Sequence, residues 1–388
     1  MITLLHRRKS FTSVPAGPVA SVDSITTTSM NGLSGGLSAL SPGYFHITEI
    51  DDDRVLIIYL QVTTNAYFCV VGDRGGGTTY TFGTPVAISG AGGSLAAGYS
   101  DGAFITISYN TDFQVHTIAG SVISASVGSG TLTNRESNAG GAAMMLMDGE
   151  TDKFFCVQQK RTNPYNIYGQ IIDITTPSSP SVGTEVLLVA GGALPPHYVL
   201  AMSRVDGNRF VVANNGGSES LRLFIVDADP GHSHTNGPVH TASGSNTSGL
   251  TYAVHALSST RGVCYFRSGA SGVNGNLRLF AIDSGTKVIT AVDTDTPPAG
   301  TNVASRADFR AGANPDEFIF TRSSGGTVET SIYSIAGDVL TELDTLSLGS
   351  ISTYQWGTGP AGCAQGNNVA YLSGKSTTGL HFVQCYGG

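Results

Sequence analysis

The sequence has little charge and a single tryptophan. Charged residues make up 12% of the 388 residues, about half the share that soluble domains usually carry. The formal net charge is −8, and basic residues cluster only at Arg7, Arg8 and Lys9. A surface that neutralises phosphates is therefore missing, and we expect no nucleic-acid partner. Because Trp356 is the only tryptophan, no repeat that needs this residue in every copy is present.

Long apolar runs are also missing. No stretch of about eighteen apolar residues occurs, so no membrane-spanning helix is expected. The first residues, MITLLHRRKS, place positive charge after the apolar residues, which is the reverse of a secretory signal. We therefore expect synthesis in the cytoplasm without membrane insertion. The five cysteines lie in apolar runs without CxxC spacing, which predicts buried free thiols.

What the chain does have is repetition. The octamer LRLFIVDA at 221–228 recurs as LRLFAIDS at 277–284, each time at the end of a hairpin-like segment. Five further segments share this pattern. The seven segments begin, in steps of 49, 50, 56, 53, 55 and 51 residues, at Val55, Phe104, Phe154, Phe210, Val263, Phe318 and Val369. A period this steady predicts a fold built from one repeated unit.

Each unit reads as four strands, because a small apolar run precedes each hairpin and a further strand follows it. The last hairpin has no following strand, but PVASVDS at 18–24 matches VITAVDT at 288–294 and VLTELDT at 339–345, which aligns Asp23, Asp293 and Asp344. We predict an all-β, seven-bladed β-propeller with four antiparallel strands per blade. An N-terminal strand at 18–26 pairs with the C-terminal blade and closes the ring. The predicted units are a basic arm at 1–17 and blades at about 44–90, 92–133, 140–191, 195–244, 248–297, 301–349 and 352–388.

The segment DADPGHSHTNGPVH, 227–240, is a candidate metal site. It carries histidines and aspartates of the kinds that bind zinc: Asp227, Asp229, His232, His234 and His240. The alternative is a polar loop between a third and a fourth strand. We favour the loop and expect no metal ion, because no further ligand follows at a fixed spacing.

Three carboxylates near the innermost strands are candidates for acid–base work at the central channel, namely Glu49, Asp148 and Asp308. Their acidic neighbours make solvated turn residues the alternative for the first two. No HExxH motif or P-loop is present, so we expect no enzyme activity and no cofactor.

Aromatic and basic residues mark candidate binding positions. Tyr67, Tyr109 and Tyr165 lie near predicted second-to-third-strand loops, where rings can stack on sugars, with packing inside a blade as the alternative. Arg222 and Arg278 occupy the same place in the two octamers. We expect them to hydrogen-bond locally at blade interfaces, because a buried guanidinium needs partners.

FGTPVAIS, Phe82–Ser89, after VLIIY and YFCVVG, resembles repeats of tailed-bacteriophage virion proteins that are predicted to be propellers. The resemblance implies a virion component in a tail, fibre or capsid decoration, with many copies in a symmetric assembly. Its partners would be other virion proteins, and the arm with Arg7, Arg8 and Lys9 would dock on an acidic neighbour.

The sequence thus supports a non-enzymatic virion protein for assembly or host contact. A carbohydrate-binding propeller with shallow sites between blades, which would contact host-surface glycans, is the alternative. A glycan hydrolase or lyase at the channel is a second alternative.

Overall fold

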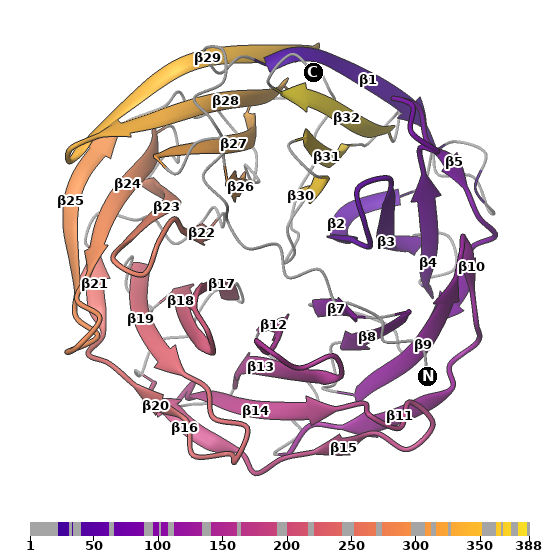
Figure 1. The fold of residues 1–388 in the computed structure, drawn as a ribbon, viewed down its shortest axis with the longest axis horizontal. Coiled ribbons are helices and arrows are strands. Elements are labelled where there is room, and N and C mark those ends of the chain that lie inside the picture. Colours follow the sequence, from indigo (N-terminus) through magenta and orange to yellow (C-terminus); the bar gives the residue numbers. More distant parts are fainter. Residues whose placement is uncertain are drawn as a thin grey trace, which may run out of the picture.

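The computed structural model describes residues 22–30, 33, 40–61, 66–88, 96–100, 102–107, 112–133, 141–160, 164–191, 200–215, 221–242, 252–268, 274–295, 307–311, 316–324, 327–350, 362–365, 368–373 and 379–385. These residues form seven antiparallel sheets arranged as a ring around a centre (Figure 1). The predicted seven-bladed β-propeller is therefore confirmed. We number the blades I to VII from residue 40 onward.

Blades I to IV each have three long strands, ordered from the centre outward. They are β2 (Leu40–Glu49), β3 (Arg54–Gln61) and β4 (Ala66–Asp73) in blade I; β7 (Ala96–Ser100), β8 (Ala103–Ile107) and β9 (Asp112–Ala119) in blade II; β12 (Gly141–Leu146), β13 (Lys153–Gln159) and β14 (Ile167–Asp173) in blade III; β17 (Leu200–Asp206), β18 (Arg209–Asn215) and β19 (Leu221–Asp227) in blade IV.

Blades V to VII have four continuous strands. They are β22 (Tyr252–Ala256), β23 (Arg261–Ser268), β24 (Asn274–Ile282) and β25 (Ile289–Asp295) in blade V; β26 (Ala307–Ala311), β27 (Glu317–Ser324), β28 (Thr327–Ala336) and β29 (Val339–Ser350) in blade VI; β30 (Gly362–Gln365), β31 (Asn368–Ser373), β32 (Gly379–Cys385) and β1 (Val22–Ser29) in blade VII.

The ring closes by pairing its first strand with its last. β1 lies antiparallel to β32, from Val22 opposite Cys385 to Ser29 opposite Gly379. The predicted closing strand is confirmed, although β1 extends to Ser29. The basic arm at 1–17 lies outside the described residues.

Blade I, which follows blade VII in the ring, contacts both strands of this closing pair. The Arg74 guanidinium lies 3.9 Å from the ring centre of Phe382 in β32, and the Tyr80 ring packs edge-on against the same phenyl group. The Tyr80 backbone N–H donates to Thr28 Oγ1 in β1 over 3.0 Å.

The outer strands of blades I to IV differ from the continuous fourth strands that we expected. Each is split into two short pieces: β5 (Thr81–Phe82) and β6 (Val86–Ile88), β10 (Val122–Ile123) and β11 (Gly128–Thr131), β15 (Ser181–Val182) and β16 (Val186–Val189), and β20 (Thr235–Asn236) and β21 (His240–Ala242). Glycine sits at three of the breaks, and the next blade comes close to its backbone. A Cβ on Gly83 would lie 2.2 Å from the carbonyl oxygen of Ser121 in blade II, too close for any side chain.

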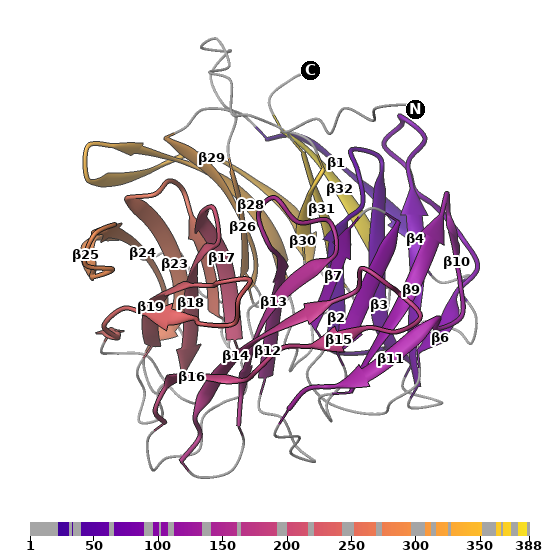
Figure 2. The same ribbon diagram turned by 60° about the horizontal axis from the view of Figure 1, so that its bottom comes forward.

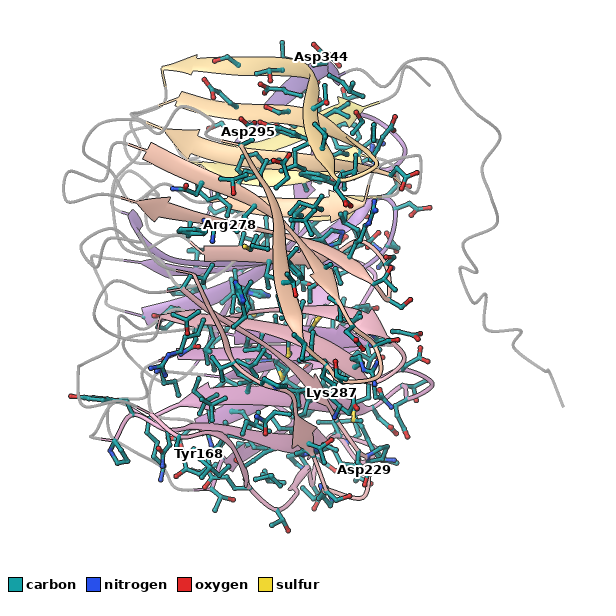
Figure 3. All side chains as sticks on the ribbon, turned by 90° about the vertical axis from the view of Figure 1, so that its left-hand side faces the viewer. Tyr168, Asp229, Arg278, Lys287, Asp295 and Asp344 are labelled. Atoms are coloured by element: carbon teal, nitrogen blue, oxygen red, sulfur yellow. The ribbon has the colours of Figure 1, made fainter. Side chains whose placement is uncertain are left out.

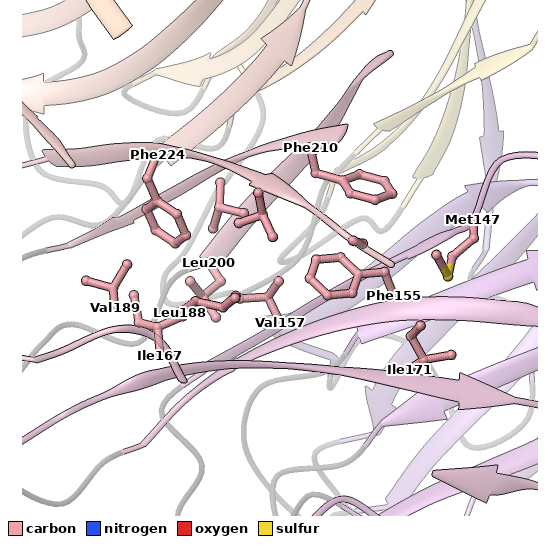
Figure 4. Packing of buried hydrophobic residues seen from close by; sticks show 13 residues of the cluster. Met147, Phe155, Val157, Ile167, Ile171, Leu188, Val189, Leu200, Phe210 and Phe224 are labelled. Atoms are coloured by element: carbon pink, nitrogen blue, oxygen red, sulfur yellow. The ribbon is translucent and has the colours of Figure 1, made fainter. Parts of the chain in front are cut away.

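The apolar core lies between neighbouring blades. Along each strand, alternate side chains point toward the preceding and the following blade. Between blades III and IV, for example, Phe155 of β13 stacks on Phe210 of β18 with ring centres 5.3 Å apart, and Phe224 and Leu188 pack in the same cluster (Figure 4). Each strand is covered on both faces, which explains why the repeated octamers are almost wholly apolar.

The antiparallel strands give the molecule two distinct faces. The turns between first and second and between third and fourth strands lie on one, which we call the turn face. The ends where second strands lead into third strands lie on the other, which we call the seam face. Asp229 and Lys287 lie on the right of Figure 3, toward the turn face, and Tyr168 and Arg278 lie on the left. Figure 2 shows the same ring of blades turned by 60°, so that the strands are seen obliquely.

Candidate functional sites between the blades

A polar cluster lies where blades II and III meet near the seam face. At its centre, Gln158 of β13 and Gln170 of β14 project toward blade II from the same side of the sheet as Phe154 and Ile172. The Gln158 side chain is 4% exposed and that of Gln170 is fully buried. On the blade III side, this interface therefore changes from apolar near the turn face to polar near the seam face.

Hydrogen bonds connect the two blades through this cluster. Gln170 Nε2 donates to Thr133 Oγ1 over 2.7 Å, and the Thr133 backbone N–H donates back to Gln170 Oε1 over 3.2 Å. Gln158 Nε2 donates to Glu185 Oε1 over 2.9 Å. Both buried amides are thus held in fixed orientations, as buried polar groups require.

Half-buried groups surround these amides. The Lys160 ammonium lies 4.6 Å from the ring centre of Tyr168, whose hydroxyl accepts a hydrogen bond of 2.9 Å from Asn166 Nδ2. Burial raises the pKa of the Glu185 carboxyl above its usual value, although the Lys160 charge and the hydrogen bond from Gln158 act in the opposite direction. A carboxylate, an ammonium, two amides and an aromatic ring therefore gather at one seam. We call Gln158, Lys160, Tyr168, Gln170 and Glu185 the II/III cluster.

The two octamer arginines occupy the neighbouring seams, one on each side of blade IV. Arg222 of β19 points toward blade III, on the same side of its strand as Phe224, and pairs in register with the buried Asn214. Arg278 of β24 points toward blade IV, on the same side as Phe280.

Among the residues that the structure describes, Arg278 shows none of the local hydrogen bonds that we expected of it. Its guanidinium carbon lies 5.2 Å from the ring centre of Phe266, and its buried Nε has no hydrogen-bond partner.

The turn face carries most of the described acidic residues. They are Asp51, Asp52, Asp53, Asp73, Asp148, Glu150, Asp152, Asp173, Asp206, Asp227, Asp229, Asp283, Asp316, Glu317 and Asp338. Fewer basic residues accompany them: Arg54, Arg74, Lys153, Arg204, Arg209, Arg261 and Lys287. This face is therefore negative, and its arginines are used in ion pairs such as Arg209 with Asp227 and Arg261 with Asp338.

Two of the tyrosines proposed for sugar stacking, Tyr67 and Tyr165, are described, and they lie in different blades. Tyr67 lies in β4, is 1% exposed and packs in the core between blades I and II, so its ring is not open to a ligand. Tyr165 is half-buried in the loop that leads into β14, with a φ of 55°. Tyr109, Arg7, Arg8 and Lys9 lie outside the described residues.

The histidine segment is folded into a blade interface. His234 is 6% exposed, and its ring packs edge-on against Phe155 with centres 5.0 Å apart. His232, with a φ of 68°, lies against Gly183 of blade III. Among the residues that the structure describes, no group of three or more histidine, cysteine or acidic side chains is arranged to hold a metal ion.

The two candidate channel carboxylates with described side chains, Glu49 and Asp148, lie in different blades. Asp148 is an exposed residue of the turn after β12 and pairs with Arg204 over 3.1 Å. Glu49 is half-buried at the end of β2, and the side chain of Asp308 lies outside the described part of the molecule.

The II/III cluster is absent from the sequence-based predictions. Its one local signal is the polar sequence Gln158-Gln159-Lys160 directly after the apolar run FFCV. At the end of a buried strand, we would expect apolar residues, or apolar and polar residues in alternation, instead of three polar residues in a row. Thr133, which hydrogen-bonds to Gln170 of the cluster, comes from the preceding blade and carries no signal of its own.

No protein-family model and no curated protein matches the sequence. No helix able to cross a membrane occurs in the portion of the chain that the structure describes. Solved structures do match by shape, among them the following three.

A chain of the COPII outer coat vertex on membranes has a TM-score of 0.58 at 10% identity, over 93% of this chain and 84% of that one. The BP39L lectin of Burkholderia pseudomallei has a TM-score of 0.50 at 12% identity, over 76% and 81%. The Nup133 β-propeller domain of Vanderwaltozyma polyspora has a TM-score of 0.50 at 6% identity, over 88% and 100%. None of these three is a virion protein, so the resemblance to bacteriophage propellers stays a prediction. At these identities the similarity shows the fold alone, and by fold this chain is a β-propeller.

Proposed function

We propose that this chain is a non-enzymatic propeller that binds carbohydrate at the seams between its blades. The observation that carries the proposal is the II/III cluster. Sugars present many hydroxyl groups that donate and accept hydrogen bonds, together with apolar C–H faces that pack on aromatic rings. Glu185 supplies acceptor oxygens, Lys160 supplies donors, and Tyr168 supplies a ring, and all three side chains are half-buried.

The geometry favours binding over catalysis. Glu185 is held by Gln158 and lies near Lys160. Of the predicted channel carboxylates, Asp148 is an exposed turn residue that pairs with Arg204. One of the structural neighbours named above is a lectin, but at 12% identity that similarity concerns the fold, and the proposal depends on the residues of the cluster.

A glycan array followed by titration calorimetry tests this proposal. The full chain is expected to bind at least one neutral glycan, and Glu185→Gln or Tyr168→Ala is expected to weaken its affinity about tenfold, the effect of losing roughly 1.4 kcal/mol. Glu150→Gln is the matched control, because this carboxylate pairs with Lys153 on the turn face. No glycan bound by the wild type, or equal binding by all three variants, would refute the proposal.

We propose, as a second candidate function, a place in a protein assembly such as a bacteriophage virion. The observation that favours it is the negative turn face, where residues such as Asp52, Asp206 and Asp338 are exposed and would attract a basic partner surface. Mass spectrometry of purified particles, with cross-links mapped onto the turn face, tests this function. Absence of the chain from the particles would exclude it.

A further inference from the structure

Each of the two seams that flank blade IV carries an arginine from the repeated octamer. Arg222 and Arg278 are each the second residue of the repeated octamer, and each points toward the preceding blade near the seam face. Among the described residues, neither guanidinium has an acidic partner. The turn-face arginines Arg204, Arg209 and Arg261 are each paired with an aspartate.

At the seam between blades IV and V, the surroundings of Arg278 suit a planar anion. The guanidinium packs over the Phe266 ring, and its Nε is buried without a partner. His240 reaches this seam from blade IV, where burial first, and then the positive charge of Arg278, lower the pKa of its imidazole. Leaving a buried charged donor unpaired costs free energy, and an anionic ligand would remove that cost.

The seam between blades III and IV repeats the arrangement with amides in place of the phenyl ring. Asn214 is 1% exposed and lies across from Arg222 in the sheet. Gln159 of blade III is 3% exposed, points toward blade IV on the same side as Val157, and has a buried Oε1 without a partner. The described residues supply no donor for that oxygen. A hydroxyl group of a ligand could donate a hydrogen bond to it.

From these two seams we infer that the chain recognises negatively charged saccharides, with Arg222 and Arg278 each holding the anionic group of the ligand. An arginine fork matches the two oxygens of a carboxylate or a sulfate. This inference rests on the proposed carbohydrate-binding function and adds to it the charge of the ligand. The II/III cluster, which contains Glu185, would bind the neutral sugar units of the same saccharide.

The test uses the full chain and three soluble probes: a galacturonic acid trimer, a galactose trimer, and a sulfated galactose trimer. Titration calorimetry at low salt is expected to give at least tenfold tighter binding for one or both charged probes than for the neutral one, with the preference falling as salt rises. The double variant Arg222→Gln/Arg278→Gln is expected to lose this preference while keeping its affinity for the neutral trimer. Arg204→Gln, on the turn face, is the control and should leave the preference unchanged.

The outcomes separate this inference from the proposed function. Equal affinity for charged and neutral trimers, or a preference that survives the double substitution, would overturn the inference and leave the carbohydrate site at the II/III cluster standing. Binding of none of the three probes, together with an empty glycan array, would overturn both. Preference for the sulfated over the carboxylated trimer, or the reverse, identifies which anion the two arginines select. Circular dichroism of the double variant establishes that its fold is intact.

Discussion

Arg209 of blade IV donates a hydrogen bond from Nη1 to the carbonyl oxygen of Ser284 in blade V, over 2.9 Å. The same contact recurs around the ring: Arg54 reaches Gly120 of blade II, and Arg261 reaches Gly337 of blade VI. In each case the arginine begins a second strand and the carbonyl belongs to the outer turn of the next blade. The hydrogen bonds of these arginines link neighbouring blades on the turn face.

Replacing Arg209 by Met should lower the free energy of unfolding by about 1–2 kcal/mol, because a charge-assisted bond between blades and the pair with Asp227 are both lost. Urea denaturation measures the change. Lys153→Met is the matched control, since Lys153 pairs with Glu150 in its own turn, and such exposed pairs contribute at most about 1 kcal/mol. Equal effects in the two variants would argue against a stabilising role for the link between blades IV and V.

Gly83→Ala should destabilise the protein by about 1–3 kcal/mol, because its Cβ would meet the Ser121 backbone at 2.2 Å and force the blade II turn to move. Thermal unfolding followed by circular dichroism measures this effect. Gly285→Ala provides the control, since a Cβ there meets only Asp283 Oδ1 at 3.5 Å. A Gly83 variant as stable as the control would show that blades I and II are packed less tightly than described.

Removing residues 1–29, and with them β1, should expose the edge of β32 and cause aggregation. Analytical ultracentrifugation of the purified protein detects it. Removing only 1–17 leaves β1 in place and should give a monodisperse protein with the melting temperature of the full chain. A soluble, fully stable protein after the longer deletion would contradict closure by β1.

Stability should fall as the pH drops from 6.5 to 4, in part because of His234. Burial, followed by the charge of His232, lowers the pKa of His234 to about 4, with Asp229 acting the other way. In this window the unfolded chain binds a proton that the folded chain does not, so the free energy of unfolding decreases by up to about 3 kcal/mol at pH 4. His234→Gln should show a shallower pH dependence in urea denaturation. Parallel curves for the two proteins would contradict a buried neutral His234.

The three cysteines with described side chains should resist alkylation in the native state. Burial raises the pKa of Cys69, Cys156 and Cys264 to about 12 each, so the reactive thiolate is scarce at pH 8 and shielded from reagent. Peptide mapping after brief iodoacetamide treatment should find these three unlabelled in buffer and labelled in urea. Rapid native labelling of any of them would place that thiol at the surface.

The blade count and the closure of the ring could be predicted because similar sequence segments recur in successive blades. The two octamers fix the third strand, and the match of Asp23, Asp293 and Asp344 identifies the missing outer strand. The structure adds a role for one of these aspartates: Asp293 Oδ2 accepts a hydrogen bond of 2.9 Å from the Leu340 backbone at the start of the next outer strand.

The split outer strands and the II/III cluster could not be predicted in the same way. Gly83 breaks its strand where a turn of another blade approaches, and Gln170 finds Thr133 across a blade interface. Neither contact is local in sequence. Tyr67 shows a second limit: whether a strand residue faces the core depends on its register, and a shift of one residue reverses the side on which the ring lies.

The pairing of β1 with β32 also constrains how the chain can fold during synthesis. Ser29 pairs with Gly379, so 350 residues (379 − 29) must be translated between the two partners. At roughly 5–20 residues per second, β1 waits on the order of tens of seconds for its neighbour. Contacts this distant in sequence form slowly, and six sheets are complete before the last one can be assembled. Until β32 has emerged from the ribosome, the nascent chain would therefore hold an open arc, and the ring would form only after that strand is available.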